Sequence, residues 1–247
     1  MQLRPLPAPR GDGRRTAAFF DVDGTLYSIN GDPTGAGTAL LHTFRVSREY
    51  SALKGAALGL LLLPIVLAMF VLDKADRAFS MWFMTSLSLH GIDTATVETS
   101  VQKFCASPLF RSMIVESVRA QLERHRAAGH LVILVSASSL VITRPIAEAF
   151  GAHIVCGSTC PRTTAVSRDN DEARTKISRA HYRNALLVGD VKQRVLARLF
   201  EQYAIDAPSS FAYSDHPTDA PMLRTVGETR IIMLVNTSSL ARTKNMR

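Results

Sequence analysis

The chain is poor in cysteine, in clustered basic residues and in apolar residues near its start. Its three cysteines, Cys105, Cys156 and Cys160, are too few for a disulfide-stabilised scaffold and are typical of a reducing compartment. His153 lies close to two of them, but a fourth ligand is missing, so we interpret this segment as structural rather than zinc-binding. No basic stripe is interleaved with aromatic residues, which argues against nucleic acid as a partner.

The first fifteen residues lack the apolar core of a secretory signal and are rich in proline, arginine and glycine. We expect residues 1–15 to form a disordered basic tail. The chain has 247 residues, enough for one sizeable domain with an insertion or for two small domains. Its formal net charge of +8 favours anionic partners such as phosphorylated substrates, lipid headgroups or nucleic acid, and selects none of them.

One stretch, AAFFDVDGTLY at residues 17–27, carries the clearest chemical signal. A short apolar run, typical of a buried strand, ends in Asp21 and Asp23 and is followed at once by Gly24 and Thr25. Strand residues two apart share a face, so both carboxylates can act on one bound group. This favours phosphate chemistry, in which one carboxylate attacks phosphorus and the other carries protons. A bare DxDG is also compatible with an ordinary strand end followed by acidic turn residues.

Apolar strand patterns alternate with helical patterns over the rest of the chain, which predicts an α/β fold with a mostly parallel sheet. A second strand is expected at residues 131–137, after a helix over 111–128, and a third strand at 153–156. Two later strands are expected at 210–213 and 230–235. The remaining helices are expected at 38–50, 94–104, 145–150 and from Lys192 onwards.

Polar side chains stand at the carboxyl ends of several expected strands, where open α/β sheets bind ligands. Ser136 lies near the end of the second strand, Lys192 opens a helix, and Asp215 and Asp219 follow a later strand. Taken singly, each has an ordinary interpretation: a satisfied hydroxyl, a solvated lysine or a helix-capping aspartate. Taken in this order and at these places, they favour a phosphatase-type site shared with the two aspartates of the first strand. His216 is interpreted as a loop residue.

Four pieces of the sequence follow the order and type of the four motifs of the haloacid dehalogenase superfamily. They are FFDVDGT, LVSAS, Lys192 and YSDHPTDAPML. From residue 17 to residue 235 the chain resembles the phosphoserine-phosphatase-like branch, subfamily IB. The resemblance implies a Rossmann-like core of mostly parallel strands, with an α-helical C1-type cap inserted after the first motif. We accordingly expect the catalytic core at 16–26 and 126–240, and a cap with an apolar hairpin at 27–125.

The resemblance also implies catalytic roles. Asp21 would be the nucleophile that forms an aspartyl-phosphate, and Asp23 the general acid and then the general base. Ser136 would donate a hydrogen bond to the phosphoryl group, and Lys192 would balance its charge. Two residues of the turn would support phosphate binding, Gly24 and Thr25.

A magnesium site is implied by the same resemblance. Asp21, the carbonyl of Asp23, and Asp215 would hold Mg²⁺, and Asp219 would orient the ligands of the metal from outside. The ion would shield the incoming phosphate from carboxylate repulsion. Because Asp23 supplies a proton donor, phosphoryl transfer is favoured over dehalogenation, which needs none there.

The expected cap contains a long apolar run, GAALGLLLLPIVLAMFVL at residues 55–72, which has eighteen residues and no charge. That length is the lower limit for crossing a bilayer. Asp21 precedes the apolar run and Ser136 follows it, yet both must enter the same site. The chain between them therefore cannot cross a membrane an odd number of times. The run could return with 78–89 as a hairpin, dip in around Pro64, lie in the interface or pack inside a soluble cap. We expect a shallow membrane-dipping hairpin, with membrane contact through residues 55–89.

The substrate is expected to be a lipid-linked phosphate. Enzymes of this branch that dephosphorylate phosphatidylglycerophosphate are similar in carrying a long apolar segment at this place. Phosphoserine phosphatases of the branch carry a glutamate that reads the substrate amine, and the corresponding residue is Asn30. We therefore expect a Mg²⁺-dependent phosphomonoesterase in the cytoplasm, associated with the cytoplasmic face of a membrane. The alternatives are a soluble small-metabolite phosphatase, phosphoserine included, and a non-catalytic membrane-binding module of the same fold.

Overall fold

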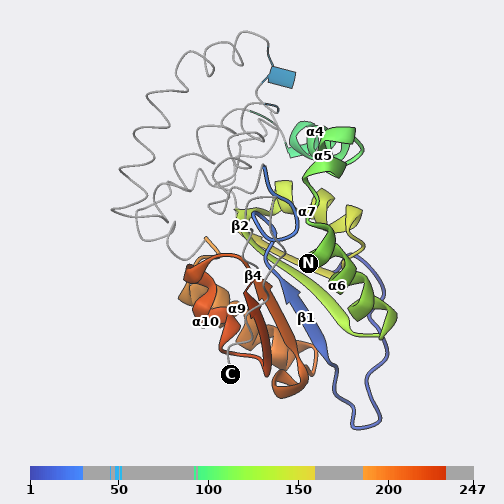
Figure 1. Cartoon of the computed structure of the whole chain (residues 1–247), viewed down its shortest axis with the longest axis vertical. Coiled ribbons are helices and arrows are strands. Elements are labelled where there is room, and N and C mark those ends of the chain that lie inside the picture. Colours follow the sequence, from blue (N-terminus) through green and yellow to red (C-terminus); the bar gives the residue numbers. More distant parts are fainter. Residues whose placement is uncertain are drawn as a thin grey trace, which may run out of the picture.

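A computed structural model describes residues 1–29, 94–158 and 186–231, together with residues 45, 48, 49, 51 and 92. Within these ranges, a five-stranded parallel sheet has the order β3-β2-β1-β4-β5 (Figure 1). Its strands are β1 (Ala17–Phe20), β2 (Leu131–Ser139), β3 (Ile154–Ser158), β4 (Phe211–Ser214) and β5 (Glu228–Ile231). The predicted α/β fold with a parallel sheet is confirmed.

The first strand, β1, lies in the middle of the sheet between β2 and β4. Its four residues are all buried because both faces of the sheet are covered. Alternate residues point to opposite faces: Ala18 and Phe20 join one hydrophobic cluster, and Ala17 and Phe19 join the other. Because β2 and β4 both run parallel to β1, the residues that follow these three strands meet at one edge of the sheet.

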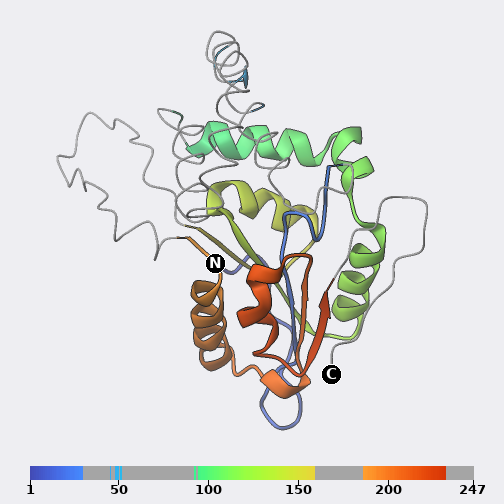
Figure 2. The same ribbon diagram turned by 60° about the vertical axis from the view of Figure 1, so that its left-hand side comes forward.

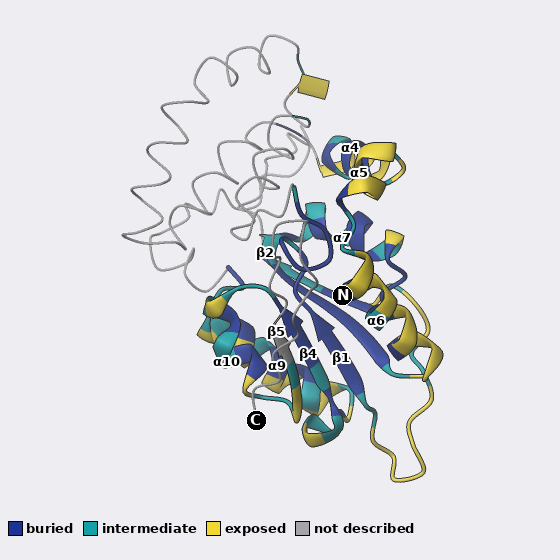
Figure 3. Ribbon diagram, in the orientation of Figure 1, coloured by how far each residue is buried: buried dark blue, intermediate teal, exposed yellow. Residues whose placement is uncertain are grey.

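Helices cover both faces of the sheet, which gives the core three layers (Figure 1). On one face lie α6 (Glu116–Ala127) and α7 (Leu140–Ala149), and on the other lie α9 (Asp190–Gln202) and α10 (Ala220–Leu223). Two short 3-10 helices, η1 (Ala207–Ser209) and η2 (Pro217–Asp219), flank β4. The central strands are buried, whereas α6 exposes its outer face to solvent (Figure 3).

Within the described part of the chain between β1 and β2, two helices precede α6, namely α4 (Thr94–Cys105) and α5 (Pro108–Met113), here called the cap helices. α4 packs against α7 and runs alongside it, above it in the view of Figure 2. Its buried face repeats at helical spacing through Val97, Val101 and Phe104. The predicted helix at 94–104 is confirmed. α5 begins at a serine cap, where Ser107 accepts the N–H of Phe110.

The prediction of one helix over residues 111–128 is wrong, because the chain forms α5 and α6 with a break between them. Ile114 has an extended backbone (φ −64°, ψ 131°) and forms an antiparallel bridge with Tyr27. The N–H of Val115 donates to the carbonyl of Leu26 at 2.9 Å. Backbone hydrogen bonds to the turn after β1 replace helical ones at this point.

Residues 1–15, predicted to be a disordered tail, are described by the structure, and the first of them pair with the sheet. The ammonium group of Met1 donates to the carbonyl of Val155 at 2.8 Å, and Gln2 forms an antiparallel bridge with Ile154. The physical reason is that β3 lies at the edge of the sheet, where unpaired backbone groups can accept another extended segment. The start of the chain occupies that edge.

Several predictions lie outside the described residues: most of the helix at 38–50, the apolar run at 55–72, its partner at 78–89, Cys160, and the chain end after residue 231. Among the residues that the structure does describe, no helix is both long and apolar enough to cross a membrane.

Candidate active site

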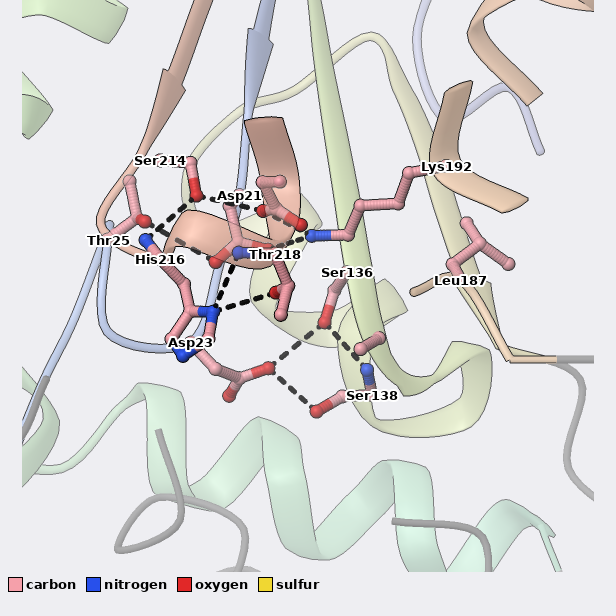
Figure 4. Close-up of polar contacts among 12 residues, drawn as sticks. Asp21, Asp23, Thr25, Ser136, Ser138, Leu187, Lys192, Ser214, His216 and Thr218 are labelled. Carbon is pink, nitrogen blue, oxygen red and sulfur yellow. Dashed lines mark hydrogen bonds and ion pairs between the residues drawn. The ribbon is translucent and has the colours of Figure 1, made fainter. Parts of the chain in front are cut away.

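The predicted site residues come together at the carboxyl edge of the sheet (Figure 4). Asp21 follows directly after β1, and its N–H donates to the carbonyl of Tyr213 in β4 at 2.9 Å. This bond extends the strand pairing by one residue and fixes the backbone that carries the carboxylate. Asp21 is 6% exposed, so its carboxylate is largely withdrawn from water.

Lys192 connects two of these carboxylates. It lies in the first turn of α9, is 2% exposed, and places Nζ 2.6 Å from Oδ1 of Asp21 and 2.6 Å from Oδ2 of Asp219. Burial alone lowers the pKa of Lys192, but the two carboxylates raise it by more, so the pKa is raised and the amine stays charged. A fixed ammonium therefore neutralises part of the negative charge at Asp21.

Thr25 joins Asp21 to Asp215. Its hydroxyl lies 2.6 Å from Oδ1 of Asp215 and 3.3 Å from Oδ2 of Asp21, and it accepts the N–H of Asp215 at 3.0 Å. Gly24 makes this approach possible: its φ is +89°, and a Cβ there would lie 2.3 Å from Oδ2 of Asp215. The turn after β1 thus needs glycine both for its backbone conformation and for space.

The carboxyl group of Asp23 is bound by three hydroxyls. Ser136 and Ser138 donate to its Oδ2 at 3.0 and 2.7 Å, and Tyr27 donates to its Oδ1 at 2.8 Å. Burial and then Asp23 raise the pKa of Tyr27 well above its usual value, so this hydroxyl stays protonated and acts as a donor. In Figure 4 both serines approach Asp23 from the end of β2.

Among the residues that the structure describes, the site carries excess negative charge, because Asp21 and Asp219 share the ammonium of Lys192 while Asp215 accepts from the neutral hydroxyl of Thr25. Burial raises the pKa of Asp21, Lys192 opposes this rise, and the carboxylates of Asp219 and Asp215 add to it. The resulting pKa of Asp21 is about 8. Burial also raises the pKa of Asp215 to about 6, against the hydrogen bond from Thr25. A divalent cation bound to Asp21 and Asp215 would offset the excess and keep both carboxylates ionised.

The donor set fits Mg²⁺, which prefers oxygen ligands and keeps several water molecules. Thr25 holds the carboxylates of Asp21 and Asp215 near one another, and the carbonyl of Asp23 is the third predicted ligand. In the described parts of the chain, no group of three His, Cys, Asp or Glu side chains could hold a metal ion by itself. The predicted set needs only two side chains, because its third ligand belongs to the backbone.

Three hydroxyls at the site have no role in the sequence prediction. Ser138 and Tyr27 bind Asp23, and Ser214 donates to Oδ2 of Asp219 at 2.8 Å. The sequence places Ser138 beside Ser136 at the end of the second strand, and their spacing of two residues on one strand is a signal that could have given the second serine a role. The loop interpretation of His216 agrees with the structure, in which its Nδ1 accepts the N–H of Thr218 at 3.1 Å and caps η2.

Comparison with known proteins places the chain in a family. Residues 18–224 match the haloacid dehalogenase-like hydrolases. A probable phosphatase of Mycobacterium tuberculosis is 27% identical over 233 residues, which are 91% of this chain and 70% of that protein. The inhibition of morphological differentiation protein of Streptomyces azureus is 26% identical over 221 residues, which are 86% of this chain and 70% of the relative.

Solved structures share the fold at low sequence identity. A protein of unknown function from Bordetella pertussis Tohama I has a TM-score of 0.64 and 20% identity, with 87% of this chain and 89% of that chain covered. A substrate-bound phosphoserine phosphatase has a TM-score of 0.51 and 14% identity, covering 87% and 85% of the two chains. The chain therefore belongs to the haloacid dehalogenase-like hydrolase family, as its sequence motifs predict.

Proposed function

We propose that this hydrolase is a Mg²⁺-dependent phosphomonoesterase that works through an aspartyl-phosphate on Asp21. The observation that carries the proposal is the pairing of Asp21 with Lys192 at 2.6 Å, beside a second carboxyl, Asp23, on the same edge of the sheet. A lone buried carboxylate would resist ionisation, whereas an ammonium fixed beside it favours the ionised, nucleophilic form.

The reaction has two steps. In the first, a carboxylate oxygen of Asp21 attacks phosphorus, a new O–P bond forms, and the O–P bond to the alcohol breaks. Asp23 gives its proton to the leaving oxygen, so the alcohol departs neutral. In the second step, Asp23 takes a proton from water, and the water oxygen attacks phosphorus. The O–P bond to Asp21 breaks, which releases inorganic phosphate and restores the carboxylate of Asp21.

The surrounding residues bind and neutralise the phosphoryl group. The hydroxyl of Ser136, now directed at Asp23, would donate to a phosphoryl oxygen instead, and Lys192 would balance the growing negative charge. Asp21, Asp215 and the carbonyl of Asp23 would hold Mg²⁺, which when bound acts as a Lewis acid and shields the phosphate from the carboxylates. Asp219 supports the site through Lys192, because its Oδ2 contacts Nζ at 2.6 Å.

Replacement of the nucleophile tests the mechanism. Purified protein should hydrolyse an aryl phosphate only when Mg²⁺ is present, and EDTA should stop turnover reversibly. Asp21→Asn should lower kcat by about 1,000-fold or more, because the amide is not a nucleophile. Undiminished turnover in Asp21→Asn would contradict the proposed mechanism.

The matched control is Asp206→Asn at the opposite, amino-terminal edge of the sheet. Asp206 also accepts from a basic residue, Arg10, at 2.7 Å, but it lies just before η1 on the amino side of β4, whereas Asp215 follows the carboxyl end of that strand. We expect this variant to keep wild-type kcat. A loss as large as that of Asp21→Asn would mean that the assay reports folding rather than chemistry.

We propose further that the substrate is a lipid-linked phosphate. The support comes from the sequence: the uncharged run at 55–72 follows the basic residues Arg45, Arg48 and Lys54, which would attract anionic lipid. The stretch 27–31 contains no carboxylate to bind a substrate ammonium, which disfavours phosphoserine.

A substrate panel tests this choice. Phosphatidylglycerophosphate in mixed micelles should give a higher kcat/KM than phosphoserine, lysophosphatidate or sugar phosphates. Faster hydrolysis of phosphoserine or a sugar phosphate would contradict the lipid substrate while leaving the phosphatase reaction intact.

A further inference from the structure

The carboxyl group of Asp23 is held from two sides. Tyr27 donates to Oδ1 at 2.8 Å, and on the other side Ser138 donates to Oδ2 at 2.7 Å and Ser136 at 3.0 Å. Without such partners, the carboxyl of an aspartate rotates broadly about its last side-chain bond. The three contacts select one orientation, in which the two oxygens have different neighbours.

Tyr27 is itself fixed by the cap helices. It is 0% exposed, and its ring centroid lies 6.5 Å from that of Phe104 in α4 and 5.4 Å from that of Phe110 in α5. Its backbone forms an antiparallel bridge with Ile114 and a parallel bridge with Asp23. The packing of the cap helices onto this ring therefore sets the position of the hydroxyl that contacts Asp23.

We propose that Tyr27 is a positioning residue that makes Asp23 present Oδ2, and not Oδ1, to the leaving oxygen of the substrate. Oδ1 accepts from Tyr27 and remains the carbonyl oxygen in the acid form. The acidic proton then sits on Oδ2, because the hydroxyls of Ser136 and Ser138 can rotate and accept instead of donating. Oδ2 is the oxygen that faces Ser136, the expected phosphoryl donor. Ser138 holds this oxygen in place after Ser136 turns to the phosphate. This inference rests on the proposed phosphatase reaction.

The role has a consequence that depends on the leaving group. An alkoxide needs a proton as its bond to phosphorus breaks, whereas a nitrophenolate leaves without one. The quantity kcat/KM reports the first phosphoryl transfer, and later hydrolysis of the intermediate does not enter it. A badly placed Asp23 should therefore lower kcat/KM for alkyl phosphates and leave it nearly unchanged for nitrophenyl phosphate.

The experiment uses Tyr27→Phe, which keeps the ring between the cap helices and removes the hydroxyl. We expect kcat/KM for glycerol phosphate to fall about 10- to 100-fold, the effect of losing a hydrogen bond to a charged group, with KM changing little. For nitrophenyl phosphate we expect a change of less than about threefold.

The matched control is Tyr213→Phe, which also removes the hydroxyl of a buried tyrosine. Tyr213 is 1% exposed and its hydroxyl lies 2.8 Å from Nε2 of His125, away from Asp23. This variant should lower the thermal midpoint of unfolding without changing the ratio of the two kcat/KM values. If both tyrosine variants change that ratio equally, the effect is structural and the proposal fails.

Ser138→Ala provides a second variant on the other side of Asp23, should Tyr27→Phe fail to fold. It should give the same selective loss for glycerol phosphate, because Oδ2 loses the contact at 2.7 Å. Equal losses on both substrates, or none, would overturn the inference. If the wild-type protein hydrolyses neither substrate with Mg²⁺, the proposed function itself fails, which is a separate outcome.

Discussion

Two opposite edges of the same sheet each hold a basic side chain between two carboxylates. At the carboxyl edge, Lys192 lies 2.6 Å from both Asp21 and Asp219, and its side chain is 3% exposed. At the amino edge, Arg10 lies 3.0 Å from Asp12 and 2.7 Å from Asp206, and its side chain is 40% exposed. The two clusters have the same kinds of charge and similar distances, and they differ in burial.

Burial decides what each cluster can do. Water competes for the exposed arginine and screens its charge, so this ion pair adds little to stability. The lysine and its carboxylates have given up hydration, which costs free energy that hydrogen bonds only partly return. We interpret the buried cluster as retained for its chemistry, because a desolvated carboxylate beside a fixed ammonium is a suitable nucleophile.

The largest expected effect in this comparison comes from Lys192→Met. It removes the cation from two buried carboxylates, so the free energy of unfolding at neutral pH should fall by about 3–5 kcal/mol. Turnover should be lost as well. Urea unfolding followed by circular dichroism measures the first effect, and a phosphatase assay with Mg²⁺ measures the second. Full activity in the variant would show that the ammonium has no catalytic part.

An intermediate effect is expected from Ser214→Ala. Its hydroxyl donates to Oδ2 of Asp219 at 2.8 Å, and this oxygen also accepts from Lys192. Loss of a hydrogen bond to a buried charged group should lower the free energy of unfolding by about 1.5–3 kcal/mol. Because the lysine becomes less well held, kcat should fall while KM changes little. A variant as stable and as active as the wild type would contradict the account of Asp219.

The smallest effect is expected from Arg10→Ala at the amino edge. The thermal midpoint of unfolding should shift slightly at low salt, and the shift should disappear at high salt because exposed charges are screened. Turnover should equal that of the wild type. Loss of activity in Arg10→Ala would contradict this comparison, because it would show that the exposed cluster affects the site at the opposite edge of the sheet.

The sequence predicts that the candidate site residues lie close together, for a physical reason. Apolar runs that end in polar residues indicate buried strands, and parallel strands bring their ends together. Asp21, Asp23 and Ser136 are placed in this way, whereas Lys192 opens a helix. In the structure Ser136 donates to Asp23, and Lys192 donates to Asp21. Their order along the chain carries information that no single residue does.

Other features are not visible in the sequence. Tyr27 and Ser214 bind site carboxylates, but a tyrosine or serine forms such a bond only when the tertiary fold supplies the acceptor. The pairing of residues 1–4 with the edge of the sheet is made by backbone groups, which leave no side-chain pattern. The break at Ile114 has the same origin, since its backbone pairs with the turn after β1.

Mass spectrometry of protein quenched in acid during turnover tests the central claim most directly. A nucleophilic Asp21 predicts that the peptide spanning residues 17–27 gains the mass of one phosphoryl group, which fragmentation assigns to Asp21 and which Asp21→Asn abolishes. Turnover with the phosphoryl group on another residue, or with no phosphorylated protein when hydrolysis of an intermediate is slowed, would contradict the account.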